Sequence, residues 1–112
     1  MNSASLHTIY PVDQERAFTE DEAYGLVDLL LIVTSKSKNK INGYNTQIEM
    51  LKNYPEKSDQ AHLELNAEIQ KWSDKVRRIG ATPLSLFEVK IKAERGFFEW
   101  KYPSANLEHI PS

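Results

Sequence analysis

The chain contains no cysteine among its 112 residues. This absence excludes disulfide bonds, thiolate nucleophiles and zinc sites built on thiolates. It also fits a reducing compartment. Together with an N-terminus that has no basic region followed by an apolar stretch, it leads us to expect a cytoplasmic protein.

Long apolar runs are missing as well. The most apolar window, 25–33, spans only nine residues and includes Asp28, whereas a membrane-spanning helix needs about 20 apolar residues. We therefore expect no membrane association. The net charge of -2 gives no overall attraction to nucleic acid. The hydrophobic fraction of 40% and the charged fraction of 27% are typical of one globular domain, here taken as 1–112.

No motif for catalysis or phosphate binding is present. The four glycines are scattered and form no phosphate loop, and no serine lies in a nucleophile elbow. His62 follows Asp59 at a spacing that can ligate a metal, but only Glu49 is expected opposite, and a metal site needs more converging ligands. We predict no enzyme activity, no metal and no cofactor.

A helix start is clearly encoded at residues 18–23. Thr19 and Glu22 have the spacing of a capping box, in which each side chain bonds the backbone N–H of the other residue. Three consecutive acids, Glu20 to Glu22, favour the positive end of the helix dipole. We predict that the first helix spans 19–54 and ends before Pro55, because proline disfavours a helical residue before it.

Apolar residues recur in this helix at alternating spacings of four and three, which is typical of a coiled-coil seam. The nine positions are Ala23, Val27, Leu30, Thr34, Ser37, Ile41, Tyr44, Ile48 and Leu51. A second helix is predicted at 58–79, followed by Gly80 as a C-terminal cap. Its seam is His62, Leu65, Ile69, Trp72, Val76 and Ile79. If 55–58 forms the turn, the two seams pair antiparallel, from Leu51 opposite His62 to Thr34 opposite Ile79.

Beyond Pro83 the apolar period changes from that of a helix to two. Residues 87–91 and 98–102 alternate apolar and polar, and Ala93 to Gly96 fits a four-residue turn. The sequence thus predicts a β-hairpin at 85–102, preceded by an extended N-terminal segment, 1–17, and followed by a tail, 103–112. The expected fold is α+β and mainly α: a long antiparallel helical hairpin of coiled-coil type followed by a C-terminal β-hairpin.

The two predicted helices differ in length by about 20 Å at 1.5 Å per residue. In this pairing the apolar residues 23–33 would have no partner from the second helix, so we expect them to be covered by another molecule. We predict a non-enzymatic structural or protein-interaction module that acts as a homodimer. The candidate partner-binding residues are Val27, Leu31, Phe97 and Phe98.

Basic residues suggest an alternative function. Six of them fall level with one another in the same pairing and form a belt around the hairpin: Lys36, Lys38, Lys40, Lys75, Arg77 and Arg78. Such a belt could bind nucleic acid or another polyanion. Because these residues lie on several sides and have no aromatic residues between them, a solvated surface is favoured, and nucleic-acid binding is not expected.

One family resemblance rests on the run Phe18-Thr19-x-x-Glu22-Ala23 at the start of a long helix, on Ile79-Gly80 at the end of the second, and on strands carrying Trp100. In these features the chain resembles a bacterial family catalogued as a domain of unknown function, family 2203, over residues 18 to about 110. That family usually continues with a strand carrying Tyr-Trp-His, of which only His109 is kept here. The resemblance implies the fold and no activity.

Overall fold

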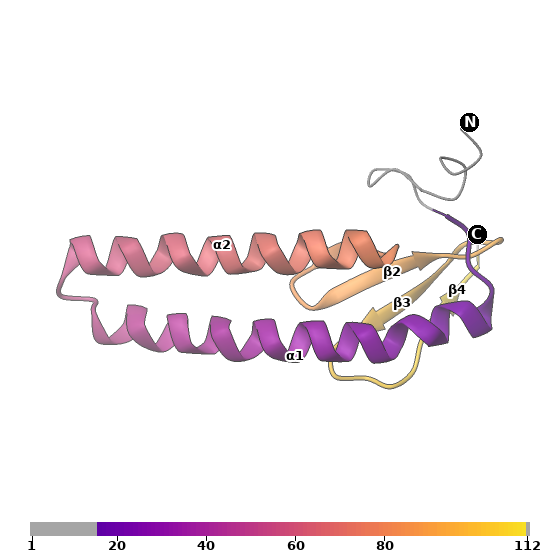
Figure 1. Cartoon of the computed structure of the whole chain (residues 1–112), viewed down its shortest axis with the longest axis horizontal. Helices are drawn as coiled ribbons and strands as arrows, with labels where there is room; N and C mark the ends of the chain where they lie inside the picture. Colours follow the sequence, from indigo (N-terminus) through magenta and orange to yellow (C-terminus); the bar gives the residue numbers. More distant parts are fainter. Residues whose placement is uncertain (1–15, 112) are drawn as a thin grey trace, which may run out of the picture.

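The computed structural model describes residues 16–111 and contains two helices followed by four strands. The helices α1 (Glu20–Met50) and α2 (Pro55–Ile79) run antiparallel side by side (Figure 1). The strands lie against the half of the hairpin that holds the start of α1 and the end of α2 (Figure 1). The α+β, mainly α class is confirmed; packing of coiled-coil type stays a prediction. The predicted N-terminal segment falls outside the described residues except for 16 and 17.

The capping box at the start of α1 is present. Glu22 N donates to Thr19 Oγ1 at 3.1 Å, and Thr19 N donates to Glu22 Oε1 at 2.9 Å. Two N–H groups that a helix end leaves without a partner are thereby satisfied. Just before this cap, Phe18 N donates to Lys92 O at 2.7 Å, so the start of α1 is attached to the sheet.

The turn between the helices lies earlier than predicted. α1 ends at Met50, and α2 begins at Pro55 rather than at Ser58. Proline is accepted in the first turn of a helix because its missing N–H would have no partner there. Pro55 therefore starts a helix as well as preventing the previous one from continuing. Gly80, with φ of 111°, closes α2 in the left-handed conformation that favours glycine.

The predicted β-hairpin is part of a larger sheet, and this is a correction. The strands β1 (Thr82–Ser85), β2 (Glu88–Lys92), β3 (Phe97–Lys101) and β4 (Glu108–Ile110) form an antiparallel sheet in that order. β1 contains Pro83, which an edge strand tolerates. β4 has only three residues and lies in the segment that we predicted to be a tail. Neither strand has the long alternating pattern from which strands are recognised.

The inner face of the sheet forms most of the core with α1. Val89 and Ile91 of β2 are fully buried, and the side chains of Phe98 and Trp100 of β3 are at most 6% exposed. Phe87 does not belong to β2: its φ is 68°, and its ring packs edge-on against Trp72 with centroids 5.8 Å apart. The predicted turn is confirmed, with Ala93 N donating to Gly96 O.

All nine predicted seam positions of α1 are buried or half-buried, but they meet α2 in a different register. Trp72 Nε1 donates to Thr34 Oγ1 at 2.8 Å, and Ser37 Oγ donates to Glu68 Oε2 at 3.0 Å. Thr34 was expected opposite Ile79, which lies seven residues beyond Trp72. The helices are thus displaced by one heptad, about 10 Å along the axis, because the turn lies at 51–54.

This displacement carries the end of α2 further along α1 than predicted. Ala23, Val27 and Leu30 are at most 3% exposed. On another side of α1, the segment after β3 passes across the helix (Figure 1), where Leu107 N donates to Tyr24 Oη at 3.3 Å. The chain itself therefore covers much of the stretch that we expected to need a partner.

Candidate protein-interaction face

A strip of apolar side chains on α1 remains in contact with solvent. Leu29 is 49% exposed and Ile32 is 53% exposed, while Leu26 and Val33 are half-buried at the edge of the core. Residues three and four apart on a helix are neighbours on its surface, so these four residues are contiguous. We call them the apolar strip. Apolar side chains that adjoin one another at the surface mark an interaction site more often than scattered ones do.

Basic side chains continue the strip and run beside it; we call them the cation border. On α1, Lys36 lies four residues after Ile32 of the strip, and Lys40 lies four residues after Lys36. Lys40 Nζ lies 3.9 Å from Glu68 Oε1, which fixes the side of α2 that faces this edge. The basic residues on that side of α2 follow Glu68 at spacings of three, four and three, so they share one edge of the helix. They are Lys71, Lys75 and Arg78.

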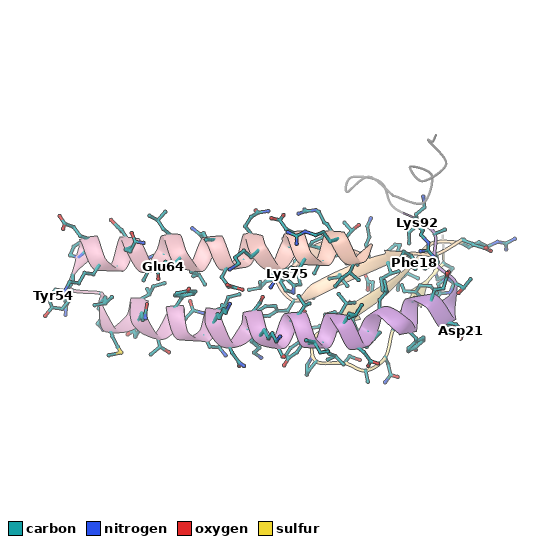
Figure 2. All side chains as sticks on the ribbon, in the orientation of Figure 1. Phe18, Asp21, Tyr54, Glu64, Lys75 and Lys92 are labelled. Atoms are coloured by element: carbon teal, nitrogen blue, oxygen red, sulfur yellow. The ribbon has the colours of Figure 1, made fainter. Side chains whose placement is uncertain are left out.

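The register places the border next to the strip. Because Trp72 bonds Thr34, Lys75 is level with about residue 31 and Arg78 with about residue 28, beside Leu29. Figure 2 shows Lys75 on the side of α2 that faces α1. Within the described residues 16–111, Lys36, Lys71, Lys75 and Arg78 form no ion pair. Four cations around an apolar strip thus form no ion pair with any carboxylate of the described part of the chain.

The predicted partner-binding residues need correction. Val27 is 3% exposed and Phe98 is 6% exposed, so both belong to the core and neither side chain is available to a partner. Leu31 is half-buried and packs against the core. Phe97 lies on the outer face of the sheet opposite Ile110, with Lys90 Nζ 5.6 Å from its ring centroid. Of the four, only Phe97 lies on an open face.

The six residues of the predicted basic belt lie on three different parts of the surface. Lys38 lies over the ring of Tyr102, with Nζ 5.3 Å from its centroid, on the side of α1 crossed by the segment after β3. Arg77 lies 3.8 Å from Asp74 and also bonds Ser73, on another side of α2. The other four, Lys36, Lys40, Lys75 and Arg78, belong to the cation border. Lys71 was missed, although its spacing of four from Lys75 was a usable signal.

The polar groups buried between the helices satisfy one another. Glu68 is 4% exposed and accepts from Ser37, while Trp72 donates to Thr34. Buried polar groups paired in this way fix how two helices meet. Because these hydrogen bonds join the four side chains across the two helices, we assign them a structural role.

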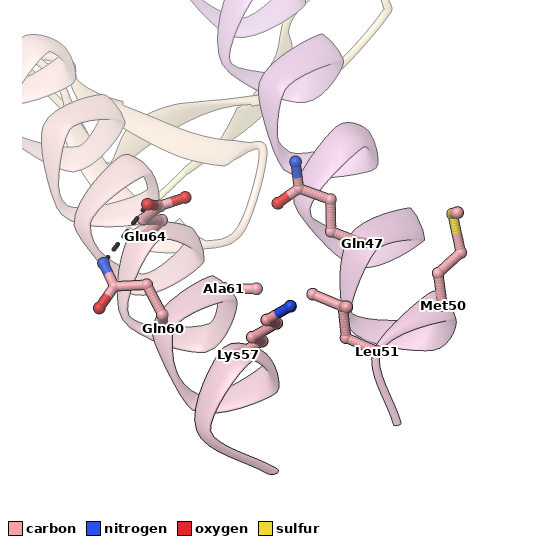
Figure 3. Close-up of a pocket in the computed structure, with 7 residues that line it drawn as sticks. All are labelled: Gln47, Met50, Leu51, Lys57, Gln60, Ala61 and Glu64. Carbon is pink, nitrogen blue, oxygen red and sulfur yellow. Dashed lines mark hydrogen bonds between the residues drawn. The ribbon is translucent and has the colours of Figure 1, made fainter. Parts of the chain in front are cut away.

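An open hollow of about 470 Å³ lies at the tip of the hairpin (Figure 3). It is lined by Gln47 and Met50 of α1, by Leu51 just after that helix, and by residues of α2, where Gln60 donates to Glu64 at 3.4 Å. Met50 is 73% exposed. The lining offers one carboxylate and one lysine with no convergent set of polar groups, which a specific small-molecule site requires.

Two histidines, including the ligand candidate His62, contact the backbone. A ring nitrogen of His62 lies 2.8 Å from Ser58 O, and one of His109 lies 2.8 Å from Arg95 O. In the described part of the chain, no three histidine or acidic side chains are grouped as metal ligands would be. Nor does a helix there have the length and apolar character needed to cross a membrane.

Neither a protein-family model, nor a curated protein, nor a solved structure matches this chain.

Proposed function

We propose that the protein is a non-enzymatic interaction module that binds another protein through the apolar strip on α1. The observation that carries this proposal is the exposure of Leu29 and Ile32, 49% and 53%, next to a cation border of which four residues form no ion pair within residues 16–111. Apolar side chains that adjoin one another on the exposed side of a helix are typical of an interaction surface. A cytoplasmic location belongs to the same proposal.

The homodimer stays a prediction, and less exposed apolar surface now supports it. It rested on an uncovered apolar stretch from Ala23 to Val33, of which Ala23, Val27 and Leu30 are now buried within the chain. The strip that remains is bordered by cations, and a second copy would bring its own. Sedimentation velocity across micromolar concentrations tests this prediction: a single species of 12.9 kDa contradicts a homodimer.

Polyanion binding remains the alternative function, favoured by the five basic residues of the cation border on one face. A polyanion would use the cations and leave the strip bare, because phosphates gain nothing from contact with leucine or isoleucine side chains. Binding of this kind weakens steeply as salt rises. It is also insensitive to removal of Leu29 and Ile32, which separates it from the protein-binding function.

The test compares three forms of the protein as bait in lysate of the cells that make it. The double variant Leu29→Glu/Ile32→Glu places charge in the strip and is expected to lose a defined set of bound proteins, quantified by mass spectrometry. Leu63→Glu is the matched control, because Leu63 is 64% exposed on α2 and outside the strip. An identical set of bound proteins for the double variant and the wild type would contradict the proposal.

A further inference from the structure

We infer that the partner of this face is an acidic amphipathic helix, which packs apolar side chains on the strip and directs carboxylates to the cation border. This inference rests on the proposed function and specifies the chemistry of the partner. Three properties of the face support it: its apolar extent, the spacing of its cations, and the sign of its charge.

The apolar extent fits two turns of a helix. From Leu26 to Val33 the strip covers about 11 Å along α1. A helix laid along it would place two or three apolar side chains in contact, at spacings of three and four, which is how amphipathic helices bind helical surfaces. Leu29 and Ile32 supply the exposed centre of this contact, and the half-buried Leu26 and Val33 connect it to the core.

The spacing of the cations favours a helix over an extended segment. Lys71 and Arg78 are seven residues apart on α2, which places them about 10.5 Å apart along the axis with Lys75 between. A partner helix that carries acids at positions i, i+4 and i+7 would place them at the same axial intervals as these three cations. In an extended strand, residues on one face repeat every ~6.7 Å. The acids of a partner strand would therefore lie further apart than the three cations, and the mismatch in position would grow from the second acid to the third.

The sign of the charge disfavours a second copy of the chain. Two cation borders brought together would oppose five basic residues with five more. Among the described residues, Lys40 is the one member of the border that forms an ion pair, with Glu68 on the inside of the hairpin. Like charges across an interface suppress the wrong partner, whereas opposite charges speed association and fix orientation. The structure therefore favours a partner that carries acids where this face carries cations.

The two kinds of contact have different roles. Exposed ion pairs add little affinity individually, so the strip supplies most of the binding and the border supplies the choice of partner. Removal of the strip should therefore weaken binding to any helix. Reversal of the border should exchange the preferred helix for one of opposite charge without abolishing binding.

The experiment uses the full chain and two synthetic helical peptides of about 18 residues, or five turns. Both have leucine at positions i, i+3, i+4 and i+7; one carries glutamate beside the leucines, and the other carries lysine there. A single-stranded uridine oligonucleotide is the third probe. Fluorescence anisotropy gives the dissociation constants at low and high salt. The wild type is expected to bind the acidic peptide at least tenfold more tightly than the basic one.

Two variants then test the assignment. Leu29→Glu/Ile32→Glu should weaken binding of the acidic peptide at least tenfold. The fourfold variant Lys36→Glu/Lys71→Glu/Lys75→Glu/Arg78→Glu should prefer the basic peptide. The control Lys52→Glu/Lys57→Glu changes charge near the tip and should leave both affinities within about twofold, as expected for sites outside the contact. Circular dichroism shows whether each variant keeps its helices.

Equal affinity for the two peptides, or no change of preference on charge reversal, overturns the inference. So does an oligonucleotide that binds more tightly than the acidic peptide and keeps its affinity in the Leu29→Glu/Ile32→Glu variant; that result favours polyanion binding. These failures differ from that of the proposed function. If cellular proteins still depend on Leu29 and Ile32 while the peptides show no charge preference, the face binds protein, but the partner is not an acidic helix.

Discussion

Trp72 Nε1 donates a hydrogen bond to Thr34 Oγ1 at 2.8 Å inside the helical hairpin, and both side chains are almost fully buried. One helical turn further along, Ser37 bonds Glu68 in the same interface. These two pairs explain why the seam of α1, apolar or aromatic elsewhere, contains a threonine and a serine. They also define the register that brings Lys75 and Arg78 beside Leu29.

The bond between Thr34 and Trp72 is expected to contribute to stability. Thr34→Val keeps the shape of the side chain but leaves the indole N–H buried without an acceptor, at a cost of about 1–3 kcal/mol. Thr46→Val is the matched control, since the hydroxyl of Thr46 is exposed and bonds only Asn42 O of its own helix. Urea denaturation measures both. Similar free energies of unfolding for the two variants would show that the helices do not meet in this register.

Truncation of two neighbouring leucines on α1 should change the stability by very different amounts. Leu30 is fully buried, and Leu30→Ala should lower the free energy of unfolding by about 2–5 kcal/mol through lost contacts and a cavity. Leu29 is 49% exposed, and Leu29→Ala should change it by roughly 0.5 kcal/mol or less. Thermal or chemical denaturation measures the free energy of unfolding of both variants. In the register predicted from the sequence, Leu30 lies beyond the end of the second helix, so a small effect of Leu30→Ala would favour that arrangement.

Two glycines should differ in the sign of their response to alanine. Gly80 has φ of 111°, and a Cβ there would lie 2.9 Å from Cζ of Phe18, which is held in the core. We expect Gly80→Ala to destabilise the protein by about 1–2 kcal/mol, the cost of the left-handed conformation, with the crowding of Phe18 in addition.

Gly25 provides the control for this prediction. It lies within α1, and a Cβ there would meet nothing within 4 Å. Gly25→Ala should therefore raise the melting temperature, through a gain of about 0.5–1 kcal/mol in helix propensity. A melting temperature of Gly80→Ala at or above that of the wild type would contradict the described end of α2.

The capping box should make stability depend on pH. The N–H of Thr19 holds the pKa of Glu22 below its ordinary value, and the charge of Arg16 lowers that pKa further. Because the folded pKa lies below the unfolded one, the contribution is present above the unfolded pKa and is lost as the pH falls through the folded pKa. Glu22→Gln should flatten this part of the stability profile.

An NMR titration of the Glu22 carboxyl carbon checks the direction and the cause. Arg16→Gln should raise the pKa of Glu22 only in part, because the Thr19 N–H remains. A pKa of Glu22 at or above the ordinary 4.5 in the wild type would contradict the capping box.

The helix start and the seam of α1 were predictable because both are local patterns. A capping box needs residues three apart, and a seam needs only regular spacing along one helix. The register was not predictable from spacing, since a displacement of one heptad returns similar positions to the interface. The turn at 51–54, with Pro55 as the first residue of α2, decides between the two registers.

The strands β1 and β4 escaped prediction for a different reason. Each is short and lies at an edge of the sheet, and its identity as a strand depends on a neighbour: β1 on β2, and β4 on β3. Their own residues, with Pro83 in one and only three positions in the other, show no period of two. Only pairing with residues elsewhere in the chain defines such strands.

The candidate face shows the same division. The sequence alone determined that α1 is a helix with one buried seam, that apolar side chains near its start exceed what that seam needs, and that cations recur on both helices, because these are properties of residues close together in the chain. The tertiary structure decided which of these residues meet. It buried Val27 and Phe98, left Leu29 and Ile32 exposed, and moved Lys75 and Arg78 beside them. The choice of register depends on the turn and on buried polar pairs between distant residues, and these energies do not appear in any local spacing.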